Sequence, residues 1–414
     1  MSETDRSANQ RRPTPVSHAS TGGKTVLAVG AGLVIAFAMM RWLLPPVETP
    51  GFQGSDANSY FAIAAGHPQD AYYYYGGRIL YPLAARYGAA VTRLSLPDGF
   101  RLLSCLSLVV FIGALCLIVG NVALLPFLLV PGFILAFRAY YFPELFYAAL
   151  TAVFFLVLSA NVWLALPFLF ALHITRESTV LLTVTLALVM ARRNRLYALA
   201  VIVVGIAGLS ISSALAARGL PNHHGIQGPL FDLLKVLYNI AHNLLGLVFW
   251  TDTNALTTDC RPEWLIRVHI GSIRQLGFCG FQWKEPATTI VALASSFGVL
   301  PLLIIRGRAR LFEGTAMSEV ATWYGALSLI AAPLIGTAVA RYTLYAWPLF
   351  WIRGGDLLNL LEPREYLLFA PLVLLSAWLP VVVTGTFSIL TVEALLYWLA
   401  YPVVGAEVAP SPGV

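Results

Sequence analysis

The chain of 414 residues is 58% hydrophobic and only 11% charged, and its mean hydropathy is +0.75. Soluble domains carry about 25% charged residues, so this balance excludes a water-soluble globular fold. The net charge of +6 is distributed over short basic clusters, which argues against a nucleic-acid partner. We therefore predict an all-α polytopic membrane protein with about 12 (10–13) transmembrane helices.

The N-terminal part predicts a tail, a first span and a long outer loop. Residues 1–24 are polar and Ser/Thr-rich, which predicts a disordered cytoplasmic tail. The apolar run 25–46 is too long for a signal-peptide core, so we expect a retained helix. Basic clusters concentrate on the cytoplasmic side, which places 47–100 outside as loop one. Within that loop, "ILYPLAARYGAAVTRL" predicts an amphipathic juxtamembrane helix.

The remaining apolar runs predict a single transmembrane domain over 25–404, followed by a tail at 405–414. Basic clusters at 191–195 and 306–310 are expected in the cytoplasm. A polar segment at 217–286 is expected to form a second large outer loop. The twelve predicted spans cover about 25–46, 102–119, 122–137, 144–158, 160–173, 177–191, 196–216, 287–305, 318–338, 342–352, 366–384 and 387–403.

The four cysteines fall into two kinds. Cys105 and Cys116 lie in an apolar run and are expected to be inert core thiols. Cys260 and Cys279 lie in the second outer loop, where an oxidising compartment favours a disulfide. Closing such a loop contributes about 3 kcal/mol in the chain-entropy model. Two unpaired thiols are the alternative.

Asp56 lies near the start of loop one, in "GSDANSYFAIAAG", and Tyr60 follows at helical spacing. One interpretation is a helix cap, in which Ser55 or Asp56 accepts backbone N–H groups. The other interpretation is a general base at the membrane surface, which takes the proton of an acceptor hydroxyl. The two roles are compatible.

Aromatic and charged residues gather on the same predicted outer side. "YYYYGGRILYPLA" contains Tyr74, Tyr75 and Arg78. It predicts either an interfacial aromatic belt with a snorkelling arginine or a lip that binds a sugar and a phosphate. Arg138 and Glu144 present the same choice, because the proline between them breaks the helix and frees backbone groups to line a cavity.

Two later motifs place ionisable groups at span ends. His173, Arg176 and Glu177 occur in "HITRES", where charges are costly and usually functional. A structural Arg–Glu pair that closes a helix junction is the alternative. Arg341 and Tyr342 open a short late span, for which a snorkelling arginine is the competing interpretation.

His223 and His224 are adjacent in the second outer loop and resemble half of a metal site. No HExxH motif or nearby carboxylate pattern completes such a site, so we predict a loop histidine pair and no metal site. Nucleotide-binding and serine-hydrolase motifs are also missing. We expect no cofactor, although a divalent metal requirement is left open.

The first helix, the long outer loop beginning with "GSDANSY", and the later "TRES" and "ARYTLYAWPLF" together resemble the GT-C superfamily of integral-membrane glycosyltransferases. The resemblance implies a multi-pass protein of the cell (inner or plasma) membrane, with a cytoplasmic N-terminus and an active site facing the periplasm or outside. It implies transfer of a sugar from a polyprenyl-phosphate carrier to a glycan or lipid acceptor. A second acidic pair in loop one is missing, because the next acid after Asp56 is Asp70, which is not part of a "DD" or "DE" doublet.

The resemblance also assigns roles to residues. Asp56 would be the catalytic base of an inverting displacement, and Arg78, Arg176 and Arg341 would neutralise the lipid phosphate. The other candidates for the substrate pocket are Tyr60, Tyr74, Tyr75, Arg138, Glu144, His173, Glu177, His223, His224 and Tyr342.

A transporter or flippase for a lipid-linked or anionic substrate is the alternative function, because it could use the same arginines and aromatic side chains. Transporters commonly contain paired repeats with broken helices at matching positions. Inspection of the sequence gives no such pairing, so the transferase is favoured.

Overall fold

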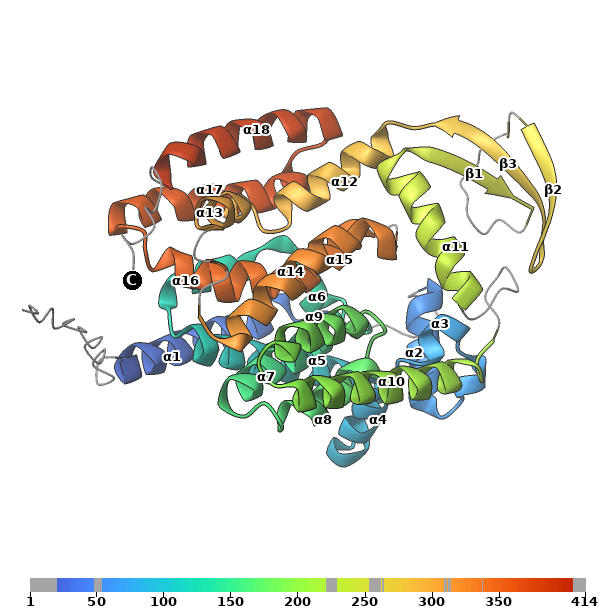
Figure 1. The fold of residues 1–414 in the computed structure, drawn as a ribbon, viewed down its shortest axis with the longest axis horizontal. Helices are drawn as coiled ribbons and strands as arrows, with labels where there is room; N and C mark the ends of the chain where they lie inside the picture. The colour runs from blue at the N-terminus through green and yellow to red at the C-terminus, as the bar shows by residue number, and fades with distance from the viewer. Residues whose placement is uncertain are drawn as a thin grey trace, which may run out of the picture.

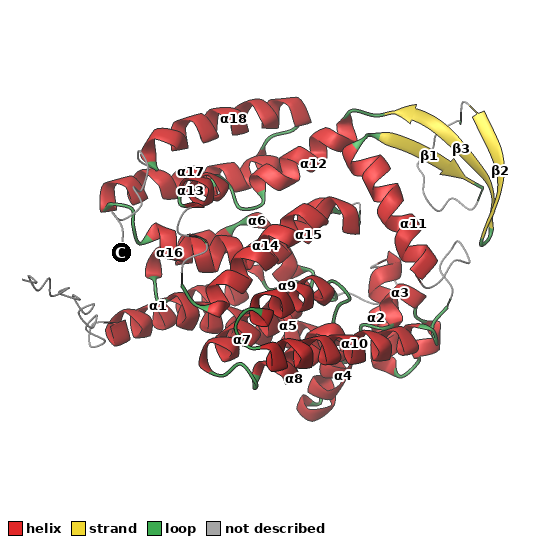
Figure 2. Cartoon of the chain, in the orientation of Figure 1, coloured by secondary structure: helices red, strands yellow, loops and turns green. Residues whose placement is uncertain are grey.

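The computed structural model describes residues 21–47, 54–220, 229–252, 262, 264–308, 311, 314–336 and 338–404. The described chain is predominantly helical (Figures 1 and 2). Six helices among these residues are long and apolar enough to cross a membrane. They are α1 (Thr21–Leu43), α5 (Leu96–Val119), α10 (Arg195–Ala216), α14 (Ala316–Ile335), α17 (Pro363–Val382) and α18 (Thr386–Val403). Because α1 starts at Thr21, the prediction of a disordered tail over 1–24 is wrong for its last four residues. Residues 1–20 lie outside the described residues.

The other predicted spans form shorter or broken helices, so a count of about twelve remains a prediction. The apolar run 122–137 divides into η3 (Val122–Leu129) and α6 (Pro131–Arg138), because a proline lacks the N–H that continues a helix. The remaining apolar pieces are α7 (Glu144–Ala160), α8 (Ala165–His173), α9 (Thr179–Ala191), α15 (Val339–Thr343), η6 (Leu344–Ala346), η7 (Pro348–Arg353) and α16 (Gly354–Leu358).

The predicted span 287–305 is also broken. It consists of α12 (Lys284–Ser295) and α13 (Leu300–Arg306), which meet at an angle of 70° and would be a seventh span if counted together. Gly298 occupies the break with φ +56°, and a Cβ there would meet the backbone of Val373. A glycine is therefore required for this bend and for the close approach of α17.

The helices form two groups with α14 and α15 between them (Figure 1). α5, α7, α8, α9 and α10 pack in succession on one side, and α12, α17 and α18 pack together on the other. The shared core includes Phe111, whose ring lies 5.1 Å from Trp347 and 5.7 Å from the fully buried Trp351. The outward faces carry exposed apolar side chains, such as Leu199 and Ile206 on α10, as expected for contact with lipid.

Loop one folds into α2 (Gly54–Ala65), η2 (Pro68–Asp70), α3 (Tyr73–Gly76) and α4 (Leu80–Thr92). The amphipathic helix predicted in this loop is present as α4. Its buried face includes Tyr81 and Ala85, and its exposed face includes Tyr87 and Val91. The ring of Tyr81 packs against Tyr60, at 6.3 Å between centroids, which joins α4 to α2.

The second outer loop contains α11 (Pro229–Asn239), the π-helical η4 (Ile240–Leu244) and an antiparallel sheet in the order β1-β3-β2 (Figure 2). The strands are β1 (Leu247–Thr251), β2 (Trp264–Ile270) and β3 (Ile273–Phe281). The all-α prediction therefore missed this sheet, because a search for membrane spans does not test the period of two that marks a strand. Cys279 lies in β3 but Cys260 lies outside the described residues, so the disulfide stays a prediction.

Candidate functional site

Six charged side chains from separate parts of the sequence meet in the structure. We call them the charged cluster. All six were predicted as site residues, and they comprise three carboxylates and three guanidinium groups. They are Asp56 in α2, Arg78 before α4, Glu144 at the start of α7, Arg176 and Glu177 between α8 and α9, and Arg341 in α15.

Glu144 lies at the centre of the charged cluster. Its Oε1 atom is 2.7 Å from Nη1 of Arg176 and 3.2 Å from Nε of Arg341. Its side chain is 4% exposed, and that of Arg176 is 1% exposed. Burial of such a pair is tolerated only because each charge is compensated. The first turn of α7 adds a favourable helix dipole for the carboxylate.

Arg78 joins loop one to the junction of α8 and α9. Its Nε atom donates to Glu177 Oε2 at 2.9 Å, its Nη2 group contacts the other carboxylate oxygen, and its Nη1 group donates to the hydroxyl of Tyr60 at 2.9 Å. Burial, partly offset by the charge of Arg78, raises the pKa of Tyr60 to about 12. Burial opposes ionisation of Glu177, but Arg78 and Arg176 outweigh it and lower the pKa of Glu177 to about 2. At neutral pH the pair is ionised and the phenol is neutral.

Asp56 is the most accessible carboxylate close to Arg341. Its Oδ2 atom is 3.8 Å from Nη1 of Arg341, and its Oδ1 atom accepts a hydrogen bond from the Tyr75 hydroxyl. The side chains of Asp56 and Arg341 are 29% and 26% exposed. Asp56 is the third residue of α2, so it lies within the first turn rather than at the cap. The carboxylate is therefore held by side chains and remains open to a ligand.

Aromatic rings enclose the cations of the charged cluster. The guanidinium carbon of Arg176 is 5.1 Å from the ring of Tyr345 and 5.6 Å from that of Tyr342. Arg341 lies over Phe142, at 4.6 Å, and over Tyr342, at 5.2 Å. These contacts stabilise cations without neutralising them. Sequence reasoning missed Tyr345 and Phe142, although Tyr345 follows Arg341 at the helical spacing of four residues.

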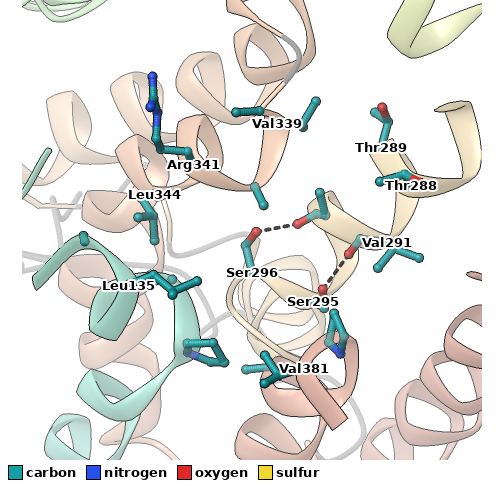
Figure 3. Close-up of a pocket in the computed structure, with 18 of the residues that line it drawn as sticks. Leu135, Thr288, Thr289, Val291, Ser295, Ser296, Val339, Arg341, Leu344 and Val381 are labelled. Carbon is teal, nitrogen blue, oxygen red and sulfur yellow. Dashed lines mark hydrogen bonds between the residues drawn. The ribbon is translucent and has the colours of Figure 1, made fainter. Parts of the chain in front are cut away.

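A cavity of about 550 Å³ opens beside Glu144 and Arg341 (Figure 3). Its walls come from α6, α12, α15 and α17 and are mostly apolar. In Figure 3, Arg341 lies at one rim, Leu135 and Val381 lie below it, and Thr288 and Thr289 lie on the opposite side. An amphipathic ligand with an anionic head could place its head at Arg341 and its apolar chain along these walls.

Several predicted residues lie apart from the charged cluster. His173 is fully buried, bonds Thr183 at 2.7 Å through Nε2, and packs against Gly205 and Gly208 of α10. That environment is a helix-packing contact. Arg138 is exposed at the end of α6, and no ion pair is found for it among the described residues. The side chain of Tyr74, and the whole of His223 and His224, lie outside the description.

No group of three or more His, Cys, Asp and Glu side chains able to hold a metal ion is found in the part of the chain that the structure describes. The carboxylates of the charged cluster are paired with arginines, so their charge is already compensated.

Comparison with protein-family models, with curated proteins and with solved structures gave no match. The function proposed below therefore depends on the geometry of the charged cluster and the cavity.

Proposed function

We propose that this protein is a membrane glycosyltransferase that moves a sugar from a polyprenyl-phosphate-linked donor to a glycan or lipid acceptor. The observation that carries the proposal is the position of Asp56 and Arg341. A partly exposed carboxylate and a partly exposed guanidinium lie 3.8 Å apart, and the arginine that carries the guanidinium is one of the residues that line an apolar cavity. Transfer from a lipid-phosphate donor requires a cation for the phosphate, an apolar groove for the lipid chain and a nearby base for the acceptor hydroxyl.

Among the three arginines, the geometry favours Arg341 as the direct phosphate ligand. Arg78 and Arg176 are buried, and each has a carboxylate partner at hydrogen-bond distance. Arg341 lines the cavity. Its Nε atom lies 3.2 Å from Glu144 without a hydrogen bond among the described residues, and its Nη1 atom lies 3.8 Å from Asp56. A phosphate offers a guanidinium two oxygens in a bidentate arrangement, so it would compete well for Arg341. Arg176 would then hold Glu144 and stabilise the position of Arg341.

The proposed reaction is a single displacement. The acceptor oxygen forms a bond to the anomeric carbon, and the bond from that carbon to the phosphate oxygen breaks. Its electron pair leaves with the lipid phosphate, whose growing charge Arg341 stabilises. The proton of the acceptor hydroxyl passes to Asp56. Attack opposite the leaving group inverts the anomeric centre.

The proposed location is the cell membrane, with the N-terminus in the cytoplasm and the charged cluster facing outward. The long apolar helices support insertion in a membrane. The basic clusters at 191–195 and 306–310 support the orientation, because Lys and Arg are retained on the cytoplasmic side.

The direct test is Asp56→Asn, which keeps the size of the side chain and removes the base. Membranes containing the full chain are incubated with polyprenyl-phosphate-linked hexoses and pentoses labelled in the sugar. We expect transfer to fall by at least about 100-fold, the usual contribution of a general base, with the unfolding temperature retained. Asp70→Asn is the matched control, because Asp70 is exposed in η2. Transfer by Asp56→Asn at the wild-type rate would refute the proposal.

The bend between α12 and α13 favours a second candidate, transport of a lipid-linked or anionic substrate. Broken helices that line a cavity are typical of transporters, and α12 lines the cavity and meets α13 at 70°. Translocation of a labelled lipid-linked sugar across liposomes, without covalent transfer, would favour this candidate over the transferase.

A further inference from the structure

A second polar group lies in the cavity wall, away from the charged cluster. Glu285, in the first turn of α12, lines the cavity and its side chain is 30% exposed. Its Oε2 atom is 3.4 Å from Nε2 of His242, whose side chain is 13% exposed. The ring of Tyr238 stacks on His242 at 5.4 Å with an angle of 10° between the planes. The imidazole is thus held beside the carboxylate of a residue that lines the cavity and is partly exposed.

The segment that carries His242 is attached to the other side of the cavity. His242 and Asn243 belong to the π-helical η4, a conformation found often at functional sites. Asn243 is buried, and its Nδ2 group donates to the carbonyl oxygens of Pro333, at 2.7 Å, and Gly336, at 3.1 Å. Those carbonyls end α14, shortly before the helix that carries Arg341. These hydrogen bonds therefore fix the distance between the side of the cavity near His242 and the side that carries Arg341.

The two ends differ in chemistry. Arg341 lines one side of the cavity, and Thr288 and Thr289 of α12 lie on the opposite side (Figure 3). Glu285, in the first turn of α12, also lines the cavity. Glu285, Thr288 and Thr289 share one face of α12, because residues three and four apart are neighbours on a helix. Thr288 donates its hydroxyl to the Lys284 carbonyl at 2.8 Å. Thr289 is 4% exposed and lines the cavity, and no hydrogen bond is found for its hydroxyl among the described residues.

We propose that Glu285 and Thr289 form a subsite for the hydroxyl groups of a sugar, with His242 as a positioning residue that orients the Glu285 carboxylate. A carboxylate accepts hydrogen bonds only, so it suits a sugar hydroxyl and disfavours a phosphate. Arg341 has the opposite preference. The inference rests on the proposed function, because it assigns the sugar and the phosphate of one lipid-linked ligand to separate ends of the same cavity.

The test uses two probes that separate these ends. Decyl β-glucoside carries a sugar without a phosphate, and decyl phosphate carries a phosphate without a sugar. Binding of each radiolabelled probe to the full chain in lipid nanodiscs is measured below the critical micelle concentration. We expect Glu285→Gln to weaken glucoside binding about tenfold or more, because a hydrogen bond to a charged group is lost, and to leave phosphate binding unchanged. Arg341→Gln should weaken phosphate binding and leave glucoside binding unchanged. Asp70→Asn should change the binding of neither probe.

Two further variants address folding and positioning. Thr289→Val keeps the shape of the side chain and removes its hydroxyl, so it should weaken glucoside binding without unfolding α12. His242→Gln keeps an N–H donor toward Glu285 and should retain glucoside binding, whereas His242→Leu should lose it.

The outcomes distinguish this inference from the proposed function. Glucoside binding unchanged in both Glu285→Gln and Thr289→Val would overturn the inference, and Arg341-dependent phosphate binding would leave the proposed function standing. An equal loss of both probes in Glu285→Gln would indicate a general collapse of the cavity and would also overturn the inference. Failure of the wild-type chain to bind either probe would overturn both.

Discussion

At the scale of single residues, Arg341 has a position that its two partner arginines lack. It contacts two carboxylates, Glu144 and Asp56, and remains partly exposed at the rim of the cavity. Arg176 lies closer to Glu144, at 2.7 Å against 3.2 Å for Arg341, but it is buried, and its Nη2 atom has no hydrogen-bond partner among the described residues. The sequence predicted one role, binding of the lipid phosphate, for all three arginines, but their surroundings in the structure differ.

Arg341→Gln is expected to weaken binding of the lipid-phosphate donor more than it slows the chemical step. The charged hydrogen bonds lost are worth about 1.5–3 kcal/mol, which corresponds to roughly a 10- to 100-fold rise in the KM for the donor. Initial rates over a range of donor concentrations would measure this. Arg138→Gln is the matched control, because Arg138 is exposed at the end of α6. A normal KM in Arg341→Gln would contradict the role of Arg341 in phosphate binding.

At the scale of elements, two ionic contacts attach loop one to the helical domain near the charged cluster. The first is the ion pair from Arg78 to Glu177 at the α8–α9 junction, and the second is the contact of Asp56 with Arg341 of α15. Ser212 of α10 adds a hydrogen bond to the Gly77 carbonyl at 3.1 Å. Loop one is therefore joined to three separate helical elements around the charged cluster, which keeps Asp56 beside Arg341.

The Arg78–Glu177 pair predicts a defined dependence of stability on pH. The pKa of Glu177 is about 2 in the folded chain, below the value of about 4.3 for an unperturbed glutamate. A carboxyl group whose pKa is lower in the folded chain than in the unfolded chain stabilises the fold. This stabilisation is complete above the pKa of the unfolded chain, and it is lost as the pH falls toward the pKa of the folded chain. The unfolding temperature of the wild-type chain should therefore be higher than that of Glu177→Gln. The difference should be the same at pH 9 and pH 6 and smaller at pH 4 and pH 3.

Unfolding temperatures of the full chain in detergent would measure this, with Asp70→Asn as the control for an exposed carboxylate. A wild-type advantage that grows on acidification would contradict the assignment of the pair.

At the scale of the whole molecule, the predicted orientation depends on the basic clusters and on the length of the apolar helices. In the part of the chain that the structure describes, six helices are long enough to span a membrane, or seven with the bent pair, whereas hydropathy predicted about twelve spans. The difference arises where prolines and short apolar runs produce helices too short to cross alone. Pro126 inside η3 and Pro348 at the start of η7 are examples.

Cysteine labelling would test the orientation. Asp70 is exposed in η2 and Arg192 is exposed after α9. With an outward-facing loop one, Asp70→Cys should react with a membrane-impermeant maleimide in intact cells, and Arg192→Cys should react only after the membrane is opened. Labelling of the wild-type chain gives the background from the native cysteines. Labelling of Arg192→Cys in intact cells would reverse the orientation.

The membrane character could be predicted from the sequence, because hydropathy is a property of each segment alone. It also identified the charged residues, because ionisable groups next to apolar runs are rare and costly. Asp56, Arg78, Glu144, Arg176 and Arg341 could be found in this way. Hydropathy could not show the sheet of the second outer loop or the break between α12 and α13, because strand pairing and a close approach of backbones depend on distant residues.

Which of these charged side chains contact one another could be seen only in the folded chain. His173 and Arg176 are three residues apart, yet one packs against glycines of α10 and the other binds Glu144 from α7. Likewise, Glu285 gains its candidate role only because η4 brings His242 beside it. The physical reason is that the role of an ionisable group depends on burial and on the charges nearby, and both are set by segments far away in the chain.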